Sequence, residues 1–241
     1  MPYSKIKEIK VRLWSNYDVH FVANDDVNII VGINGSGKTT LLTDIKKLAL
    51  SNIDDKYLVV LIPSADNIVI RDKRRTSNAL TQDLEFYIFD METGPSMMSY
   101  RMSMVDAPAD KQAAMKVRVA EFCSIVNNLF KETDKRIEIE GNKFNVVSNG
   151  KILSVDALSS GEKQILLILL RVFLLDCKES CVLLDEPENS LDIGWQHELI
   201  NMLIRLNPNA QFFITTHSHI WGETGWSNKI IQMEDVTTLV K

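Results

Sequence analysis

The chain contains 241 residues, and 45% of them are apolar, which is an ordinary composition for a soluble globular protein. This length can bury a sizeable core in one large domain or two small ones, so coiled-coil rods and disordered tails are excluded. With 27 basic and 32 acidic residues the net charge is −5. The surface as a whole is therefore not built to attract nucleic acid, although a local basic patch is still compatible with this charge.

Neither a secretion signal nor a membrane span is expected. The first twelve residues include four basic residues with no apolar stretch behind them, so they do not form a signal peptide. The most apolar segment, residues 165–175, is interrupted by Arg171 and has about half of the ~20 residues that a membrane crossing needs, so we expect a buried helix. The three cysteines lack C-x-x-C spacing, which argues against disulfides and zinc. We therefore expect a cytoplasmic protein.

The first part of the chain predicts three strands, a loop and a helix. Residues 5–13 and 18–22 alternate between charged and apolar side chains, and residues 26–31 end in the apolar run VNIIV. The third strand runs directly into the glycine-rich segment 32–40, and the following residues 41–50 have helical spacing. The order is therefore strand, glycine-rich loop, helix.

The middle of the chain predicts two strands and one long helix. Residues 57–62 form an apolar strand closed by Pro63, and residues 84–89 are expected to form another strand. A polar loop with the basic run 71–75 lies between them. Apolar residues recur at helical intervals from 109 to 131, which predicts a helix that is too short for a coiled-coil arm.

Short strands are expected after this helix. Residues 136–139 and 143–147, separated by a Gly-Asn turn, predict a hairpin, and residues 152–155 add a third strand. We therefore expect residues 64–135 to be an insertion or small helical subdomain, and residues 136–156 to be an antiparallel hairpin region.

The last part of the chain returns to alternating strands and helices. Residues 181–184 and 211–215 predict buried strands, and residues 191–206 predict the helix between them. Strands that alternate with helices imply an α/β fold with a mostly parallel sheet and helices on its faces. We expect residues 1–241 to form a single domain of this kind.

The glycine-rich segment matches the pattern G-x-x-x-x-G-K-[ST] over residues 32–39. Glycines let the backbone curl so that successive NH groups point at phosphate, and the N-terminus of the following helix adds its dipole. We expect Lys38 to reach the β- and γ-phosphates and Thr39 to ligate Mg²⁺. The flanking strand and helix favour this function over a glycine turn beside a stray lysine. The other nucleotide-binding residues expected here are Asn34, Gly35, Ser36, Gly37 and Thr40.

Two carboxylates follow the apolar strand 181–184. Ligands bind at the carboxyl ends of strands in open α/β sheets. We expect Asp185 to hold Mg²⁺, usually through water, and Glu186 to be the base that orients and deprotonates the attacking water. Because a strand ending in Asp-Glu is common, this prediction depends on the phosphate loop upstream.

Two further segments allow a structural or a functional interpretation. Residues 158–164, LSSGEKQ, form either a plain helix N-cap or a helix start that binds a second phosphate, and both roles can hold together. The sequence TTHS places His217 at the same sheet edge as Asp185, although such a histidine is more often structural. His219 suggests a metal, but with no third ligand nearby zinc is not expected.

Five segments, in this order, resemble the motifs of ABC-class ATPases. They are GINGSGKTT as Walker A, LSSGEKQ as the signature, VLLDEP as Walker B, ENSLD as the D-loop, and TTHS with the switch histidine. Within the class, IIVGINGSGKTTLL, the SSGEKQ form and EPENSLDIGWQHELI look like the SMC, RecF and OLD-like branch rather than transporters. The small size resembles single-head ATPases of bacterial genome-maintenance and anti-phage systems, such as Septu-type and retron-associated ATPases.

The resemblance implies a P-loop NTPase fold that works as a head-to-tail homodimer around two ATP molecules with Mg²⁺. Each ATP would be bound by Walker A of one subunit and by the signature of the other, where Ser159, Ser160 and Gly161 would contact the γ-phosphate. Asp192 would lie at the dimer seam, and His217 would sense the γ-phosphate. Loss of the γ-phosphate would remove contacts that bridge two subunits, so nucleotide state would be coupled to shape.

Some features of the resembled family have no clear counterpart. The glutamine expected between the two lobes is not evident after residues 57–62, and Gln82 is the candidate. Trp14 or Tyr17 is the candidate for stacking on adenine, with a core or surface role as the alternative. No long coiled coil is present, so an SMC-like rod is excluded. No acidic cluster like that of the Toprim nuclease follows His217, so nuclease activity of its own is not expected.

Three functions compete at this point. The first is an ATP-hydrolysing switch that controls a separately encoded effector, such as a nuclease or toxin, or a nucleic-acid transaction in defence or DNA repair. The second is a transporter energy subunit, against which the missing glutamine counts. The third is a scaffold that uses ATP only as structural glue. For the basic run 71–75 we favour a solvated loop over nucleic-acid contact, because the chain is acidic and the run has no interleaved aromatics.

Overall fold

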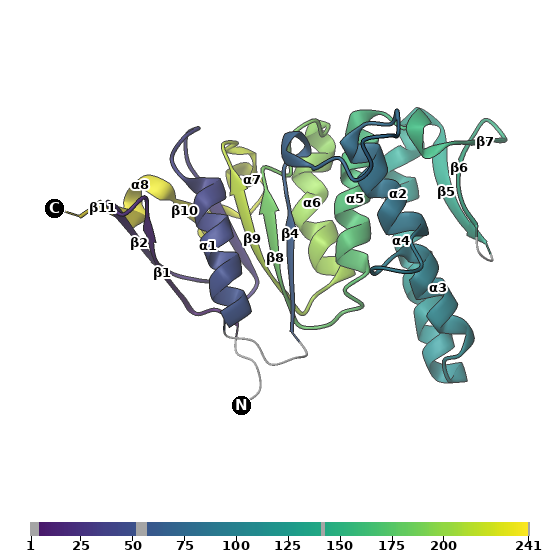
Figure 1. Cartoon of the computed structure of the whole chain (residues 1–241), viewed down its shortest axis with the longest axis horizontal. Coiled ribbons are helices and arrows are strands. Elements are labelled where there is room, and N and C mark those ends of the chain that lie inside the picture. Colours follow the sequence, from purple (N-terminus) through teal and green to yellow (C-terminus); the bar gives the residue numbers. More distant parts are fainter. Residues whose placement is uncertain (1–4, 52–56, 141–142, 241) are drawn as a thin grey trace. The chain divides into compact units, whose positions relative to one another are not determined.

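The structure is a computed structural model that describes residues 5–51, 57–140 and 143–240 (Figure 1). The chain divides into two compact units, described separately below. Unit 1 consists of Met1–Asn67, Cys177–Asn189 and Gln196–Lys241, and unit 2 of Ile68–Asp176 and Ser190–Trp195. Within the described residues, no helix is both long enough and apolar enough to cross a membrane.

Unit 1 is built on a five-stranded parallel sheet in the order β10-β3-β9-β8-β4. Every residue of β3, β8 and β9 is buried, as expected for central strands covered on both faces. The strands are β3 (Val27–Val31), β4 (Leu58–Ile62), β8 (Ser180–Asp185), β9 (Ala210–Thr216) and β10 (Ile230–Gln232).

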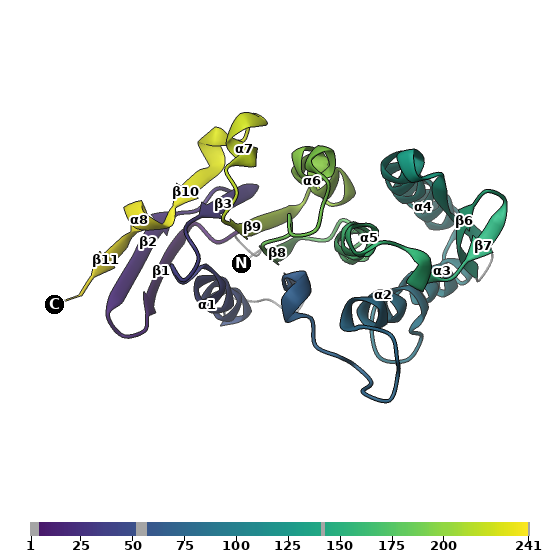
Figure 2. The ribbon, with the colours of Figure 1, turned by 90° about the horizontal axis from the view of Figure 1, so that it is seen from above.

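Helices and a second sheet cover the parallel sheet of unit 1. Helices α1 (Lys38–Ser51) and α6 (Ile193–Leu206) lie on opposite faces of it (Figure 2). A buried cluster that includes Ile9, Ile45 and Phe213 joins the α1 side to an antiparallel sheet in the order β1-β2-β11. The remaining elements are β1 (Glu8–Leu13), β2 (Tyr17–Val22), β11 (Thr237–Leu239), α7 (Ile220–Glu223) and α8 (Met233–Val236).

Unit 2 combines four helices with a three-stranded antiparallel sheet. The Phe173 ring lies 5.0 Å from the Tyr100 ring and 4.9 Å from the Phe122 ring, measured between centroids, so α3, α4 and α5 meet at one aromatic cluster. The elements are α2 (Ala79–Phe89), α3 (Met97–Val105), α4 (Ala109–Leu129), α5 (Ser160–Phe173), β5 (Lys135–Glu140), β6 (Lys143–Ser148) and β7 (Lys151–Leu153).

The strand predicted over residues 84–89 is wrong, because these residues form the second half of α2. The segment LEFYIF is rich in aromatic residues, which favours a strand locally. However, Asn78 caps the helix by accepting a hydrogen bond from the Thr81 NH at 2.8 Å. Leu84 and Ile88, four residues apart, are fully buried on one helical face. Burial of this face therefore decides the conformation.

The predicted α/β class is confirmed, with a parallel sheet, flanking helices and antiparallel strands. The buried helix predicted over residues 165–175 corresponds to α5, and the hairpin predicted before it is β5-β6-β7. Its predicted Gly-Asn turn, residues 141–142, lies outside the described residues. Helix α3 and the C-terminal elements β10, α8 and β11 were not predicted. A single functional domain over residues 1–241 stays a prediction.

Candidate functional site

A glycine loop joins β3 to α1 in unit 1. Gly35 has φ +82° and Gly37 has φ +92°, which is the left-handed region that glycine adopts without strain. A Cβ atom on Gly37 would lie 2.8 Å from Cη2 of Trp14 and 3.0 Å from Cδ1 of Leu13. A larger residue at position 37 would be strained, because φ is positive there and the Cβ atom would contact Trp14 and Leu13.

Lys38, the first residue of α1, turns its side chain back into this loop. The side chain is 5% exposed, and its Nζ donates to the carbonyl oxygens of Gly32 at 2.9 Å and Ile33 at 3.1 Å. The same Nζ lies 3.6 Å from Oε1 of Glu186. Burying an ammonium group is costly unless its charge is compensated, so this arrangement prepares the loop for an anionic ligand.

The side chains of Thr39 and Asp185 are hydrogen-bonded to each other in unit 1. The Thr39 hydroxyl donates to Oδ2 of Asp185 at 3.0 Å, and the Thr215 hydroxyl donates to Oδ1 at 2.7 Å. Asp185 is 4% exposed. Hydroxyl and carboxylate oxygens are the ligands that Mg²⁺ prefers, and this ion is usually held by one or two carboxylates and several waters. The donor set therefore fits Mg²⁺, and the described residues hold no cluster of three or more His, Cys, Asp or Glu side chains arranged for another metal.

Glu186 follows β8 with φ +45°, a left-handed backbone conformation that is uncommon for a non-glycine residue. Its Oε2 accepts a hydrogen bond from Nδ2 of Asn189 at 3.2 Å, and its Oε1 lies 3.5 Å from Nδ1 of His217. Burial alone would raise the pKa of Glu186, but Asn189, Lys38 and His217 outweigh it and hold the pKa below its ordinary value. The carboxylate therefore stays ionised at neutral pH.

Nδ1 of His217 lies near two carboxyl groups, those of Glu186 and Glu188, and a role for Glu188 was not predicted. Its Nδ1 is 3.9 Å from Oε1 of Glu188, a residue that is only 4% exposed. The Thr216 hydroxyl donates to Oε1 of Glu188, whereas Oε2 has no hydrogen-bond partner among the described residues. Burial raises the pKa of Glu188. The signal in the sequence was a second glutamate two residues after Glu186, at the carboxyl end of a buried strand.

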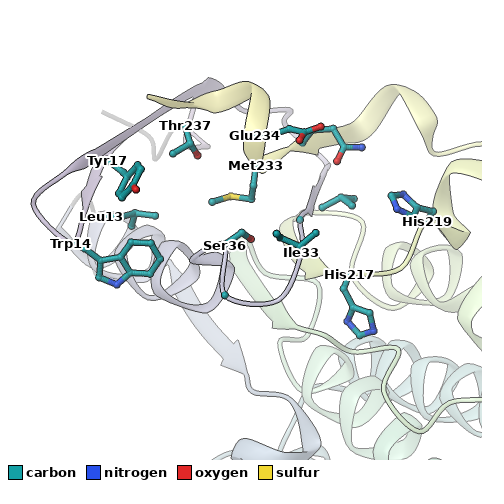
Figure 3. A pocket seen from close by; sticks show the side chains of 14 residues that line it. Leu13, Trp14, Tyr17, Ile33, Ser36, His217, His219, Met233, Glu234 and Thr237 are labelled. Atoms are coloured by element: carbon teal, nitrogen blue, oxygen red, sulfur yellow. The ribbon is translucent and has the colours of Figure 1, made fainter. Parts of the chain in front are cut away.

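Two cavities adjoin the glycine loop, and both are lined by Trp14 and Gly35. The larger one, of about 550 Å³, has Trp14 and Tyr17 at one end and His217 and His219 at the other (Figure 3). The smaller one, of about 350 Å³, is lined by Trp14, Asn34, Gly35, Gly37, Lys38, Thr39, Thr40 and Glu186. Glu186 and the predicted Walker A residues other than Ser36 therefore share one cavity of unit 1, whereas Ser36 lines the larger cavity.

The signature segment starts α5 in unit 2. The Ser159 hydroxyl accepts a hydrogen bond from the Glu162 NH at 3.2 Å, and the Glu162 carboxylate accepts one from the Ser159 NH at 2.7 Å. This reciprocal capping box confirms the structural interpretation of the segment. The side chains of Ser159 and Ser160 are exposed. The phosphate-binding role of this segment stays a prediction.

Glu162 also ties the signature helix to the segment before β5 and to β5 itself. Its carboxylate accepts from Nζ of Lys135 at 2.8 Å and from the Thr133 hydroxyl at 2.7 Å, and Glu162 is 1% exposed. Burial would raise the pKa of this carboxyl, but Lys135, the Ser159 NH and Thr133 outweigh it and lower the pKa. The ion pair therefore stabilises the base of the signature loop at neutral pH.

Replacing Lys135 by methionine is expected to destabilise unit 2 by about 3 kcal/mol, because it leaves an uncompensated buried carboxylate. Since the folded-state pKa of Glu162 is lowered, its stabilising contribution is complete above the ordinary pKa and is lost as pH falls through the lowered value. Urea unfolding at neutral pH measures the loss. Adding Glu162→Gln to Lys135→Met should recover part of it, and equal urea midpoints for the parent and the single variant would contradict the proposed pairing.

The D-loop lies against the signature within unit 2. A Cβ atom on Gly161 would lie 2.4 Å from the carbonyl oxygen of Ser190, so only glycine allows this approach. Ser190 itself has φ +66°. Oδ1 of Asp192 accepts a hydrogen bond from the Gly194 NH at 2.8 Å, at the start of α6. The structure thus brings Gly161 and Ser190 of the D-loop together in unit 2, whereas Lys38 belongs to unit 1.

The side chain of Gln82, the candidate for the glutamine between the two lobes, is buried and hydrogen-bonded inside unit 2. Gln82 is 2% exposed on α2. Its amide accepts a hydrogen bond from the Asp72 NH at 2.8 Å and donates to the Ser77 carbonyl oxygen at 2.8 Å. These bonds hold the loop that contains the basic run.

The three arginines of the basic run 71–75 form ion pairs with neighbouring acidic residues. Arg71 also stacks on the Phe86 ring, with its guanidinium carbon 3.6 Å from the ring centroid. These contacts favour the interpretation as a solvated loop over a nucleic-acid contact. The ion pairs are Arg71 with Asp83, Arg74 with Asp72, and Arg75 with Glu85.

Comparison with known proteins shows a partial match to one family and a similarity of fold. The family described as "AAA domain, putative AbiEii toxin, Type IV TA system" matches residues 101–220. No curated protein sequence matches. A crystal structure of the SMC head bound to the C-winged helix domain of ScpA is similar at TM-score 0.53 and 14% identity, over 98% of this chain and 97% of that chain. A putative ABC transporter ATP-binding protein from Pyrococcus furiosus is similar at TM-score 0.52 and 14% identity, over 96% and 97%.

These similarities agree with the motif order and with the geometry of unit 1. The matched family region contains the signature, Walker B and TTHS segments, and the structural similarity extends over almost the whole chain. The chain therefore has the P-loop fold of ABC and SMC-like ATPases.

Proposed function

We propose that this chain binds and hydrolyses ATP as a head-to-tail homodimer, and that the dimer is a nucleotide-dependent switch. One observation carries the proposal. Unit 1 gathers a buried cation, a hydroxyl and carboxylate pair, an ionised glutamate and a histidine around one glycine loop. These groups are Lys38, Thr39, Asp185, Glu186 and His217.

The loop and α1 would hold the triphosphate. Lys38 would move its hydrogen bonds from the loop carbonyls to phosphate oxygens, and the backbone NH groups of residues 34–40 would complete the cradle. Thr39 and Asp185 would hold Mg²⁺, which when bound neutralises phosphate charge.

Glu186 would orient the attacking water and accept its proton. Its lowered pKa keeps it ionised, so it can accept a hydrogen bond from water at neutral pH. His217, 46% exposed beside it, would contact the γ-phosphate. Both groups sit at the carboxyl end of the parallel sheet, where ligands bind in α/β folds.

The second subunit would complete the site. Ser159 and Ser160 are exposed at the N-terminus of α5, where the helix dipole and free NH groups favour an anion. We propose that they and Gly161 contact the γ-phosphate bound to the partner, with Asp192 at the seam. Hydrolysis would then remove the bridge between the subunits.

Trp14 is proposed to stack on the adenine, because it lines the cavity of the Walker A residues and is 55% exposed. Replacing Trp14 by alanine is expected to weaken ATP binding by about 5- to 100-fold, since stacking of a base on an aromatic ring contributes about 1–3 kcal/mol. Titration with ATP and with inorganic triphosphate measures the effect. The affinity of Trp14→Ala for inorganic triphosphate should change little. If its affinity for ATP is also unchanged, the adenine does not stack on Trp14.

The switch is proposed to control a separately encoded effector, such as a nuclease or toxin, in bacterial defence or DNA repair. The description of the matched family names an AbiEii toxin of a type IV toxin–antitoxin system. The similar SMC head was solved with a bound ScpA domain. A transporter energy subunit is the alternative, supported by the similarity to the Pyrococcus furiosus protein. The internal hydrogen bonds of Gln82 count against it, because this glutamine is not available to a membrane partner.

The test combines turnover with assembly and capture. Purified chain should release phosphate from ATP in the presence of Mg²⁺, and sedimentation should show a dimer with ATP and a monomer with ADP. Binding without turnover would support a scaffold instead. Affinity capture of the chain from its native cells with ATP then identifies the partner. A nuclease or toxin supports the proposal, DNA alone favours repair, and a permease would replace the proposal with the transporter function.

A further inference from the structure

Lys163 is a nearly buried lysine close to the start of α5 in unit 2. It is only 7% exposed, although a lysine is rarely buried unless an acidic group pairs with it. Within the ranges that the structure describes, no side chain forms an ion pair or a hydrogen bond with its ammonium group. Unit 2 therefore carries a positive charge here that its own fold does not compensate.

The neighbouring acidic residue, Glu162, is already paired with a different lysine. Its Oε2 accepts hydrogen bonds from Nζ of Lys135 at 2.8 Å and from the Ser159 NH at 2.7 Å. Its Oε1 accepts from the Thr133 hydroxyl at 2.7 Å and from the same Nζ at 3.0 Å. Because Lys135 compensates the charge of Glu162, the charge of Lys163 remains unpaired at the start of α5.

The helix places Lys163 one turn after the signature serines. Its backbone NH donates to the Ser159 carbonyl oxygen at 2.9 Å. Residues three and four positions apart share one helical face, and helical side chains lean toward the N-terminus of their helix. The side chain of Lys163 therefore covers the turn that begins with the exposed Ser159 and Ser160. Since a lysine buries its aliphatic stem but keeps its charged head at the surface, the ammonium group belongs beside these two hydroxyls.

These groups together match a phosphate. Two hydroxyls, the free NH groups of a helix N-terminus and an unpaired ammonium are all donors, and the helix dipole adds to the positive potential. Lysine binds phosphate as a compact point charge. In the proposed dimer, the phosphate that reaches this turn is the γ-phosphate of the nucleotide bound by the partner.

We infer that Lys163 is the cation that unit 2 presents to the γ-phosphate held by a second copy of this chain. The inference rests on the proposed function, because the partner brings the phosphate. Lys38 of one subunit and Lys163 of the other then bind the same phosphate from opposite sides. When the γ-phosphate is lost, a charge-assisted contact between the subunits is lost with it.

The test replaces Lys163 by methionine in a chain that also carries Glu186→Gln, so that ATP persists. Sedimentation with ATP should show a dimer dissociation constant about 10- to 100-fold higher than without Lys163→Met, because a hydrogen bond to a charged group is lost. The ATP affinity of the single subunit should change by less than about threefold, since its own phosphate loop is intact. The matched control is Lys116→Met, an exposed lysine on α4 of the same unit, which should assemble like the parent.

A conservative variant separates charge from packing. Methionine keeps the apolar stem of the lysine without its charge, whereas Lys163→Arg keeps the charge but needs more room. If the charge acts, Lys163→Arg recovers most of the assembly that Lys163→Met loses. Parental assembly of Lys163→Met, or an equal loss in both variants, would overturn the inference. The thermal midpoint of Lys163→Met should equal or exceed that of the parent, because an unpaired buried charge is removed.

A second measurement needs no dimer. In a ¹⁵N-labelled chain carrying Lys38→Ala, which weakens the phosphate loop of unit 1, inorganic triphosphate should shift the amide signals of Ser160 and Gly161. Adding Lys163→Met should abolish these shifts, and unmoved signals in the Lys38→Ala chain would overturn the inference. If the signals shift as expected but the parental chain does not assemble with ATP, the proposed dimer switch is wrong and the phosphate site at α5 is supported.

Discussion

Replacing Glu186 by glutamine (Glu186→Gln) is expected to lower ATP turnover by about 10²- to 10⁴-fold while ATP remains bound. The amide cannot accept a proton from water, but it keeps the size of the side chain and its hydrogen bond from Asn189. Because the γ-phosphate persists, the dimer should accumulate. Phosphate release measures the first effect, and sedimentation with ATP measures the second.

The comparison variant for this prediction is Glu179→Gln. Glu179 is exposed and lies immediately before β8, at the opposite end of this strand from Asp185. It should behave like the parent in both measurements. If Glu186→Gln hydrolyses ATP at the parental rate, Glu186 is not the base. If the variant loses turnover but does not stabilise the dimer, Glu186 remains the assigned general base, but the proposal of a nucleotide-dependent switch is contradicted.

Lys38→Ala should act at an earlier step and weaken nucleotide binding at least tenfold. A hydrogen bond to a charged group contributes about 1.5–3 kcal/mol, and each 1.4 kcal/mol is a factor of ten in affinity. The side chain is 5% exposed and already lies inside the loop, so little ordering is needed when phosphate arrives. Isothermal titration with ATP measures the change.

Lys47→Ala provides the control on the same helix. Lys47 lies in α1 but is 72% exposed, and within the described part of the chain its ion pair is with Asp44, three residues earlier, at 2.7 Å. Its loss should leave ATP affinity within about twofold, because exposed ion pairs contribute little. Equal affinities for the parent and Lys38→Ala would contradict the phosphate-binding role of the loop.

The parts of the candidate site that sequence analysis predicted are carried by short patterns. The roles of the glycines and of Lys38 follow from the local backbone pattern of the glycine-rich loop. Asp185 ends a buried strand and Glu186 follows it, at the carboxyl end where ligands bind in α/β sheets. His217 was placed correctly because parallel neighbours β8 and β9 end at the same edge. Local pattern and sheet topology were sufficient to bring these residues together.

The parts that were missed depend on tertiary contacts. Burial of Leu84 and Ile88 on one face of α2 overrode the strand preference of LEFYIF. Helix α3 has a weak apolar period, and β10 and β11 are three-residue strands that exist only through pairing with β3 and β2. Glu188 lies two residues after Glu186, but its contacts with Thr216, the last residue of β9, and with His217, the residue after it, are tertiary and do not follow from this spacing.

The capping box of Ser159 has a consequence for how this residue could contact phosphate at the proposed subunit boundary. A hydroxyl has one hydrogen to give and two lone pairs. At Ser159 one lone pair receives the Glu162 NH, and the hydrogen is still available for another oxygen. An incoming phosphate can therefore take this hydrogen without unwinding the first turn of α5. Docking of the proposed second subunit would then need no melting of this turn.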